Sequence, residues 1–441
     1  MGGGLGSGPR SDAGGVVTGV PSSARGHSVW TALAPAGSTV FRAASARGVR
    51  VTGADGRRYL CADSGLWNVP LGYGNPVIAD AVARALHDSS YLPVFRSSHV
   101  GAESAASALL ALAGGRYRRV VFSTSGGAAN DAAMKLVRHY WHLREAPQRR
   151  LVIGLEGSYH GLTHGSHALS GDALLHDVYA LDRRSVRHVP FDDGGERLEA
   201  LLRREGSRVG ALVLEPVLGS GCRVVPDEFL RRVQELREQY GFLLVADEVA
   251  TGFHRTGPLF ASERWSPAPD VLVLSKALTH GSCAAAVLLV GESIVSVADR
   301  SEAVFVHGET QAGTPSTCAA ILATLAEFER REAGLLAAGV GDQLDRLADR
   351  LLRSPLVTEV TGAGCFRGVH LRHADGSALS GSEVTALVTS VREAGVLVHP
   401  GPSAIQLVPA FVFDDENIGE LESTLLTAFD RPERVLDGGA P

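Results

Sequence analysis

The chain has 441 residues, 45% hydrophobic and 20% charged, proportions that indicate a globular protein with one large and one smaller domain. Its formal net charge is −6 and its basic residues are dispersed, which argues against a nucleic-acid-binding or membrane-surface protein. The five cysteines form no CxxC pair, and no apolar run approaches the ~20 residues of a membrane span. These features favour a cytoplasmic protein without a metal site and without nucleic-acid or membrane partners.

The chain begins with "MGGGLGSGPRSDAGG", which is low in complexity and lacks the apolar stretch of a signal peptide. Residues 1–26 are therefore predicted to be a disordered leader. Further along, five short runs rich in Val, Leu and Ile end in polar or glycine residues. They are Arg119–Gly127, Leu151–Gly161, Ala211–Gly221, Phe242–Gly252 and Val271–Gly281. Because these runs do not alternate with polar residues, they predict strands buried on both faces.

Helical patterns lie between these strands. Residues 127–141 open on a glycine and carry apolar residues at helical spacing. Residues 227–241 have Asp227 as a candidate N-cap and Gly241 as a candidate stop. This alternation predicts an α/β fold, with a mostly parallel sheet sandwiched by helices.

After Pro315 the pattern changes to long helices over residues 318–352, followed by two strand pairs and two further helices. This order predicts a small α+β domain. We therefore expect a large, cofactor-binding domain over residues 76–315, a small domain over 316–441, and an N-terminal segment, 27–75, that joins the small domain.

Chemically useful residues follow four of the strands: Ser125-Gly126-Gly127, Glu215, Asp247-Glu248 and Lys276. In an open parallel sheet the carboxyl ends of the strands face one crevice. A desolvated lysine is a nucleophile toward aldehydes, an aspartate can hold a proton on a ring nitrogen, and a Gly-Gly step at a helix N-terminus binds phosphate. Aldehyde, ring nitrogen and phosphate are the three handles of pyridoxal phosphate, so the set predicts that cofactor.

Several motifs extend this pattern. "VADEVATGFHRTG" (Val245–Gly257) is followed by "SKAL", which places Lys276 29 residues after Asp247. The others are "SGLWNVPLGYGNP" (Ser64–Pro76), "SGGAAND" (Ser125–Asp131), "SYHG" (Ser158–Gly161), "LEPV" (Leu214–Val217) and "HGETQAGTP" (His307–Pro315). From about Val51 to its C-terminus, the chain resembles the class III, ω-transaminase-like aminotransferases of fold type I.

The resemblance assigns a role to each matching residue. Lys276 would bind the cofactor as a Schiff base and shuttle a proton, and Asp247 would pair with the pyridinium nitrogen. The other cofactor-binding residues would hold the phosphate, pack on the ring or lie close to it: Ser125, Gly126, Gly127, Tyr159, Glu215 and Val249. Thr310 would reach the phosphate of the neighbouring subunit's cofactor, which implies a homodimer with shared active sites. We interpret His160 as an ordinary loop histidine and Glu248 as a structural acid.

Three departures from the family pattern concern the site. Gly127 and Ala128 replace a hydroxyl residue and a glutamate, and Ala250 replaces a glutamine, so one contact to the phosphate and one to the ring are missing. His399 stands where ω-transaminases have a mobile arginine that binds the substrate carboxylate. The residues expected to contact substrate are Trp67, Phe95 and His399, with Arg96 as an alternative carboxylate clamp.

The function implied is transfer of an amino group from a small-molecule donor to a ketone or aldehyde by a ping-pong mechanism. Because a neutral histidine binds a carboxylate weakly, we expect an acceptor without an α-carboxylate. In these departures the chain also resembles the aminotransferases of the daptide type, which act on a peptide's C-terminal ketone in natural-product biosynthesis. An aminomutase, racemase or decarboxylase on the same scaffold, or a non-catalytic scaffold protein, would share these motifs.

Overall fold

The computed structural model describes residues 29–34, 40–172 and 174–430. The chain divides into two units, residues 1–43 and 44–441, and the fold below is that of the second unit. The leader predicted over residues 1–26 lies outside the described residues.

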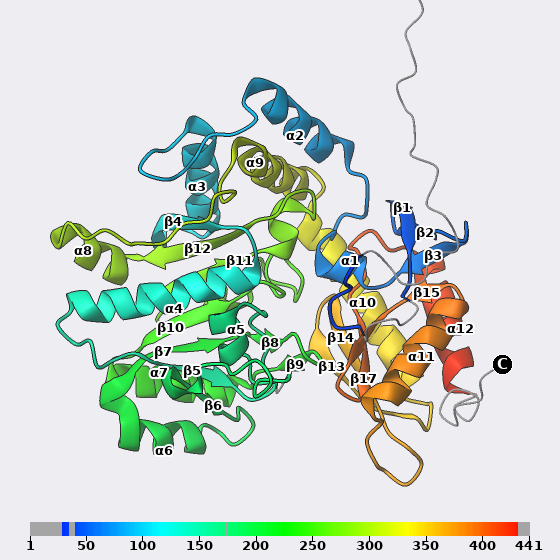
Figure 1. The fold of residues 1–441 in the computed structure, drawn as a ribbon. Helices are drawn as coiled ribbons and strands as arrows, with labels where there is room; N and C mark the ends of the chain where they lie inside the picture. The colour runs from blue at the N-terminus through cyan, green and yellow to red at the C-terminus, as the bar shows by residue number, and fades with distance from the viewer. Residues whose placement is uncertain (1–28, 35–39, 173, 431–441) are drawn as a thin grey trace, which may run out of the picture. The chain divides into compact units, whose positions relative to one another are not determined.

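A seven-stranded sheet forms the centre of the fold, in the order β4-β12-β11-β10-β7-β5-β6 (Figure 1). The strands are β4 (Tyr117–Ser123), β5 (Leu151–Leu155), β6 (Val186–Val189), β7 (Val209–Leu214), β10 (Leu243–Asp247), β11 (Val271–Leu274) and β12 (Ala286–Gly291). All neighbours pair in parallel except β12, which runs antiparallel to β11 and β4. The five predicted strands and the mostly parallel sheet are confirmed. The strands β12 and β6 were not predicted, and in β6 Arg187 and His188 interrupt the apolar run.

Helices cover both faces of this sheet. On one face α4 (Gly126–Leu143), α5 (His164–Leu169) and α8 (Glu292–Arg300) pack on residues such as Val245 and Val273. On the other face, α6 (Glu196–Glu205) and α7 (Asp227–Tyr240) pack on residues such as Leu244. Adjacent residues of one strand thus face different helix layers, which explains why the strand sequences do not alternate.

The ends of α7 confirm one expectation and correct another. Gly241 ends the helix with a φ of 70°, a left-handed conformation that glycine adopts without strain. Asp227 was expected to be the N-cap, but Pro226 takes that position and Asp227 is the first helical residue. Its carboxylate still lies in the first turn, where its negative charge stabilises the helix by interacting with the positive end of the helix dipole.

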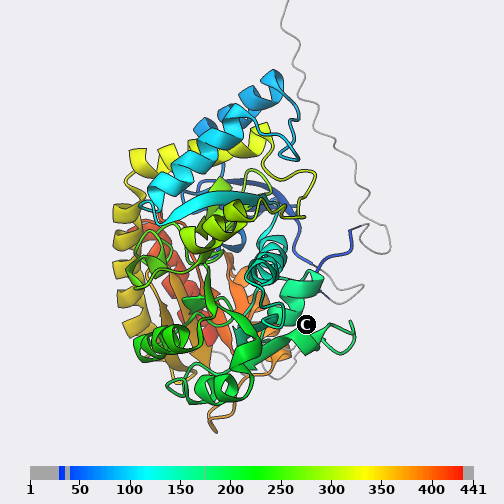
Figure 2. The same ribbon diagram turned by 90° about the vertical axis from the view of Figure 1, so that its left-hand side faces the viewer.

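Beside the sheet, α2 (Pro76–Asp88) and α3 (Val100–Leu112) pack against α9 (Pro315–Arg330), as Figure 2 shows. The chain continues through α10 (Ala333–Leu351), β13 (Val357–Ala363), β14 (Phe366–Leu371) and α11 (Gly381–Glu393). It ends with β15 (Val396–Leu397), β16 (His399–Gly401), β17 (Ala404–Leu407) and α12 (Asp415–Phe429).

These C-terminal strands form two small sheets. The strands β13, β14, β17 and β16 form an antiparallel sheet, and β15 pairs in parallel with β3 (Arg58–Cys61). Two further strands, β2 (Arg50–Gly53) and β1 (Ala43–Arg47), extend the β3 side.

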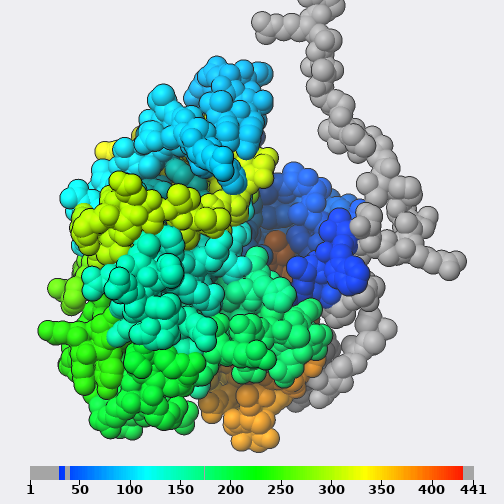
Figure 3. All heavy atoms as spheres, turned by 60° about the vertical axis from the view of Figure 1, so that its left-hand side comes forward, coloured from blue at the N-terminus to red at the C-terminus, as the bar shows by residue number. Residues whose placement is uncertain are grey.

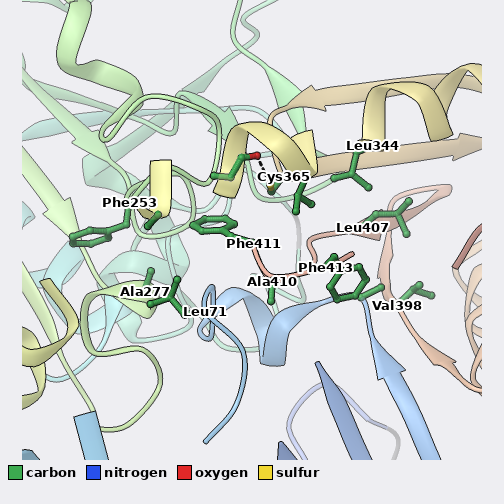
Figure 4. Packing of buried hydrophobic residues seen from close by; sticks show 14 of the residues in the cluster. Leu71, Phe253, Ala277, Leu344, Cys365, Val398, Leu407, Ala410, Phe411 and Phe413 are labelled. Carbon is green, nitrogen blue, oxygen red and sulfur yellow. Dashed lines mark hydrogen bonds between the residues drawn. The ribbon is translucent and has the colours of Figure 1, made fainter. Parts of the chain in front are cut away.

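One hydrophobic core joins these layers. In Figure 4 Phe411 lies between Phe253, which precedes the sheet's β11, and Cys365, which precedes β14. Residues from the two ends of the chain therefore pack around the loop that carries Lys276, and this packing fixes the position of the site.

Candidate active site

The loops that follow β4, β5, β7, β10 and β11 surround one cavity of about 530 Å³. This is the place that the parallel sheet predicted, because the carboxyl ends of its strands meet there. Nine residues expected from the sequence line this cavity: Trp67, Ser125, Gly126, Gly127, Tyr159, Glu215, Asp247, Val249 and Lys276.

Lys276 follows β11 by two residues and has a φ of 45°. A non-glycine residue in this left-handed region costs about 1–2 kcal/mol, a strain typical of functional positions. Its Nζ lies 4.5 Å from the centre of the Trp67 ring. Burial lowers the pKa of Lys276 to about 8, although the charges of Asp247 and Glu215 oppose the shift. The amine is therefore neutral more often than a surface lysine, as a nucleophile must be.

Asp247 ends β10, and three donors fix its carboxylate. The backbone N–H of Val249 donates to Oδ1 at 3.1 Å, while Asn130 Nδ2 and His160 Nδ1 each donate to Oδ2 at 2.7 Å. Burial alone would lower the pKa of His160, but the hydrogen bond and charge of Asp247 outweigh it and raise that pKa. The interpretation of His160 as an ordinary loop histidine is therefore wrong: its buried side chain orients the acid.

The phosphate end of the cavity is the start of α4. Ser125 is the N-cap, and its Oγ accepts a hydrogen bond from the Ala128 N–H at 3.2 Å. The first backbone N–H groups of this long helix, from Gly126 onward, have no intrahelical partner and suit a phosphate. A Cβ at Gly126 would lie only 2.9 Å from Val249 Cγ1. The glycine therefore lets the helix start and Val249 approach each other.

Glu215 and Tyr159 also line the cavity. The Glu215 carboxylate accepts hydrogen bonds from the N–H groups of Tyr159 and Gly219, both at 2.9 Å, and burial raises its pKa to about 7. Glu248 instead accepts from the N–H groups of Ala261 and Ser262 and lies outside the residues that line the cavity. The structural role expected for Glu248 is thus confirmed.

Other sequence-predicted residues lie outside the cavity wall. Thr310 and Phe95 are exposed, and neither they nor Arg96 line the cavity. His399 does not line the cavity either, but its ring contacts that of Trp67, with 5.8 Å between the ring centres. Asn130 was not predicted as a site residue; the signal for it is its position four residues after Gly126, one turn further along the same helix face.

These residues fit pyridoxal phosphate. A partly neutral, half-buried lysine, a carboxylate held by three donors and a helix N-terminus with free amides open into one cavity. Each is the partner that one handle of the cofactor requires. Fold and site together define a pyridoxal-phosphate-dependent enzyme of fold type I.

Comparison with known proteins gives the family. The model of the class-III aminotransferases matches residues 33–429, and the chain belongs to this family. It is 30% identical to a putrescine–pyruvate aminotransferase of Pseudomonas aeruginosa, over 74% of this chain and 76% of the relative. It is 31% identical to an acetylornithine aminotransferase of Methanothermobacter thermautotrophicus, over 84% and 89%.

Solved structures agree with this assignment. An amine transaminase from an uncultivated Pseudomonas species, in its PLP-bound form, superposes with a TM-score of 0.85 at 28% identity, covering 92% of this chain and 98% of that one. A transaminase from the marine bacterium Virgibacillus gives a TM-score of 0.85 at 26% identity, with coverage of 90% and 94%. The chain is therefore a pyridoxal-phosphate-dependent aminotransferase.

The side chains divide the chemistry among them. Pyridoxal phosphate, when bound, supplies the aldehyde that takes up the amino group and the ring that withdraws electrons. Lys276 Nζ can accept a proton from the substrate carbon and return it, because its lowered pKa leaves part of the amine neutral. Asp247 Oδ1 and Oδ2, held in place by three donors, can keep a proton on the ring nitrogen.

Within residues 29–34, 40–172 and 174–430, no helix is long and apolar enough to cross a membrane.

Proposed function

We propose that this aminotransferase moves an amino group from a small-molecule donor to a ketone or aldehyde that carries no carboxylate beside the carbonyl. The observation that carries the proposal is the charge of the cavity wall. Among the described residues that line it, Lys276 is the only lysine or arginine, and Lys276 is committed to the cofactor.

The nearby guanidinium groups are engaged elsewhere. Arg255 is fully buried and donates to the Pro409 carbonyl at 2.6 Å and to Ser64 Oγ at 3.1 Å. Arg367 donates to the carbonyl oxygens of Gly362 and Gly364, at 2.8 and 3.1 Å. Neither side chain lines the cavity, so neither forms the paired hydrogen bonds by which arginine binds a carboxylate.

His399 cannot replace them at neutral pH. Burial lowers its pKa, with a further lowering from the charge of Lys276 against the opposing charge of Asp63. The imidazole is therefore neutral, and it is not among the residues that line the cavity. A substrate carboxylate entering this site would lose its hydration without gaining a cation, which is unfavourable.

The size of the cavity favours a bulky acceptor. Away from the phosphate end, small residues line part of it: Ala250, Ala284 and Ala285. Such a wall accommodates a large uncharged substituent, and a peptide with a C-terminal ketone, as in natural-product biosynthesis, is one acceptor of this kind.

The same proposal includes a homodimer, because Thr310 does not reach the cavity of its own chain. The segment that carries Thr310, residues 304–310, lies against residues 91–95. Tyr91 Oη donates to the Thr310 carbonyl at 3.0 Å, and a Cβ at Gly308 would lie 2.6 Å from the Phe95 ring. Five large apolar side chains are exposed on these two segments: Tyr91, Leu92, Phe95, Val304 and Val306. Figure 3 shows residues 300–313, in yellow-green, along this surface. A contiguous apolar surface of this kind suits a second copy of the chain.

A matched pair of acceptors tests the proposed substrate class. The enzyme in its pyridoxamine form would be mixed with pyruvate or with N-methylpyruvamide, which replaces the carboxylate by an uncharged amide, and the cofactor absorbance followed. We expect kcat/KM for the amide to exceed that for pyruvate by roughly tenfold or more, because only the carboxylate loses its hydration without gaining a cation. Equal or faster conversion of pyruvate would refute the proposal, while sedimentation velocity checks the dimer separately.

A further inference from the structure

Ser125, Gly126 and Gly127 at the start of α4 form the expected phosphate-binding cup. The cup offers backbone amides, but its last residue, Gly127, carries no hydroxyl side chain. Four hydroxyl groups lie near it, one of them that of the buried Ser166. Thr124 Oγ1 donates to the Glu309 carboxylate, and Ser125 Oγ caps the helix by accepting from the Ala128 N–H. The third is that of Thr163, whose side chain lines the cavity.

A close approach of two backbones brings Thr163 to the cup. Gly161 has a φ of 120°, and a Cβ there would lie 2.4 Å from Gly127 Cα, so the residue 161 loop touches the helix start. A Cβ added at Gly127 would lie 3.5 Å from Thr163 Oγ1 and 3.3 Å from Ser166 Oγ. Thr163 therefore presents its hydroxyl beside the space that a side chain at position 127 would occupy.

Ser166 holds this hydroxyl in place. Its side chain is fully buried, its N–H donates to Asp131 Oδ1 at 2.5 Å, and its Oγ lies 2.9 Å from Thr163 Oγ1. Ser166 Oγ also lies 3.2 Å from the Thr163 carbonyl oxygen, to which it can donate. Because a hydroxyl rotates freely, Ser166 can donate to Thr163 Oγ1 instead, which leaves the Thr163 proton free to point into the cavity.

We propose that Thr163 donates a hydrogen bond to the cofactor phosphate and thereby supplies the hydroxyl that Gly127 lacks, with Ser166 as the residue that positions it. The inference rests on the cofactor assignment and not on the proposed acceptor. It gives the cup a side-chain ligand from the loop after β5 in addition to the amides of α4.

The test compares ligands with and without the phosphate. The full chain, freed of cofactor, would be titrated with pyridoxal 5′-phosphate and with pyridoxal, and each Kd measured by quenching of protein fluorescence. We expect Thr163→Ala to weaken binding of the phosphorylated ligand about tenfold and to leave pyridoxal binding within about twofold, since one hydrogen bond to a charged group is lost. Thr163→Ser, which keeps the hydroxyl, should bind as the native chain does.

A second-site variant makes the test reciprocal. In the Thr163→Ala background, Gly127→Ser places a hydroxyl in the vacated space and should restore the affinity for pyridoxal 5′-phosphate to within about threefold of the native value. The proposal is overturned if Thr163→Ala leaves the Kd unchanged, or if it weakens both ligands equally, as a general loss of structure would.

Discussion

Replacing His399 by arginine tests most directly how this site treats a carboxylate. His399 lies on β16 with its ring in contact with Trp67, and its pKa is lowered by burial, so the native residue brings no charge. An arginine at the same backbone position has a longer side chain and a permanent charge, and its end could extend past the edge of the Trp67 ring toward the cavity.

The expected gain follows from two opposing contributions. A hydrogen bond between a guanidinium and a carboxylate contributes about 1.5–3 kcal/mol. The carboxylate of Asp63, whose charge already acts on His399, would compete for the new guanidinium. Since Asp63 also accepts hydrogen bonds from the Gly65 N–H and the Cys61 thiol, part of its charge is engaged. We therefore expect the lower end of the range, about 1.5 kcal/mol or roughly tenfold in kcat/KM.

The assay is the half-reaction of the pyridoxamine form with pyruvate and with N-methylpyruvamide. His399→Arg should raise kcat/KM for pyruvate about tenfold and change that for the amide by less than about threefold. His399→Gln is the matched control, since it keeps a neutral donor of similar size and should leave the ratio of the two substrates unchanged. If His399→Arg also leaves that ratio unchanged, position 399 does not govern carboxylate binding and the reasoning fails.

Three further predictions concern the cofactor-binding residues. His160→Ala removes one of the three donors to Asp247, so kcat should fall roughly tenfold or more. The pH dependence of the absorbance of the bound cofactor should shift as well, and an unchanged pH profile would contradict the positioning role. Because the pKa of Lys276 is lowered to about 8, its neutral fraction rises only about tenfold between about pH 7 and pH 9 and then levels off. The rate at which the cofactor-free chain captures pyridoxal phosphate, measured by stopped-flow absorbance, should rise by the same factor. A rise of about a hundredfold would indicate an ordinary lysine. Gly126→Ala places a methyl group 2.9 Å from Val249 Cγ1 and should weaken binding of pyridoxal phosphate about tenfold in a fluorescence titration, while Val249→Ala in the same chain should recover most of the loss.

The residues at strand ends were predictable from the sequence because the chemistry is local to each motif. An apolar run that ends in Asp247 or Lys276 shows both the strand and the group at its carboxyl end, and the parallel sheet brings such ends together. The contact between His160 and Asp247 was not predictable in this way, since 87 residues separate the two positions. The same limit applies to Thr163, which approaches the cup only because Gly161 and Gly127 lie in contact.

The conformation around Trp67 shows a second limit of sequence reasoning. Ser64, Gly65, Leu66 and Trp67 all have positive φ, from 42° to 70°, and three of them are not glycine, so local preferences oppose this turn. Tertiary contacts stabilise it: Ser64 Oγ donates to the Val408 carbonyl at 2.7 Å and accepts from the buried Arg255. The "SGLW" motif therefore indicates that Trp67 belongs to the site. Its position beside Lys276, however, depends on Arg255, about 190 residues further along the chain. The charge of Arg255 is buried without a carboxylate partner among the described residues. A buried cation of this kind is costly unless its donors are satisfied, which ties the geometry of the substrate cavity to the packing of the C-terminal strands on the rest of the chain.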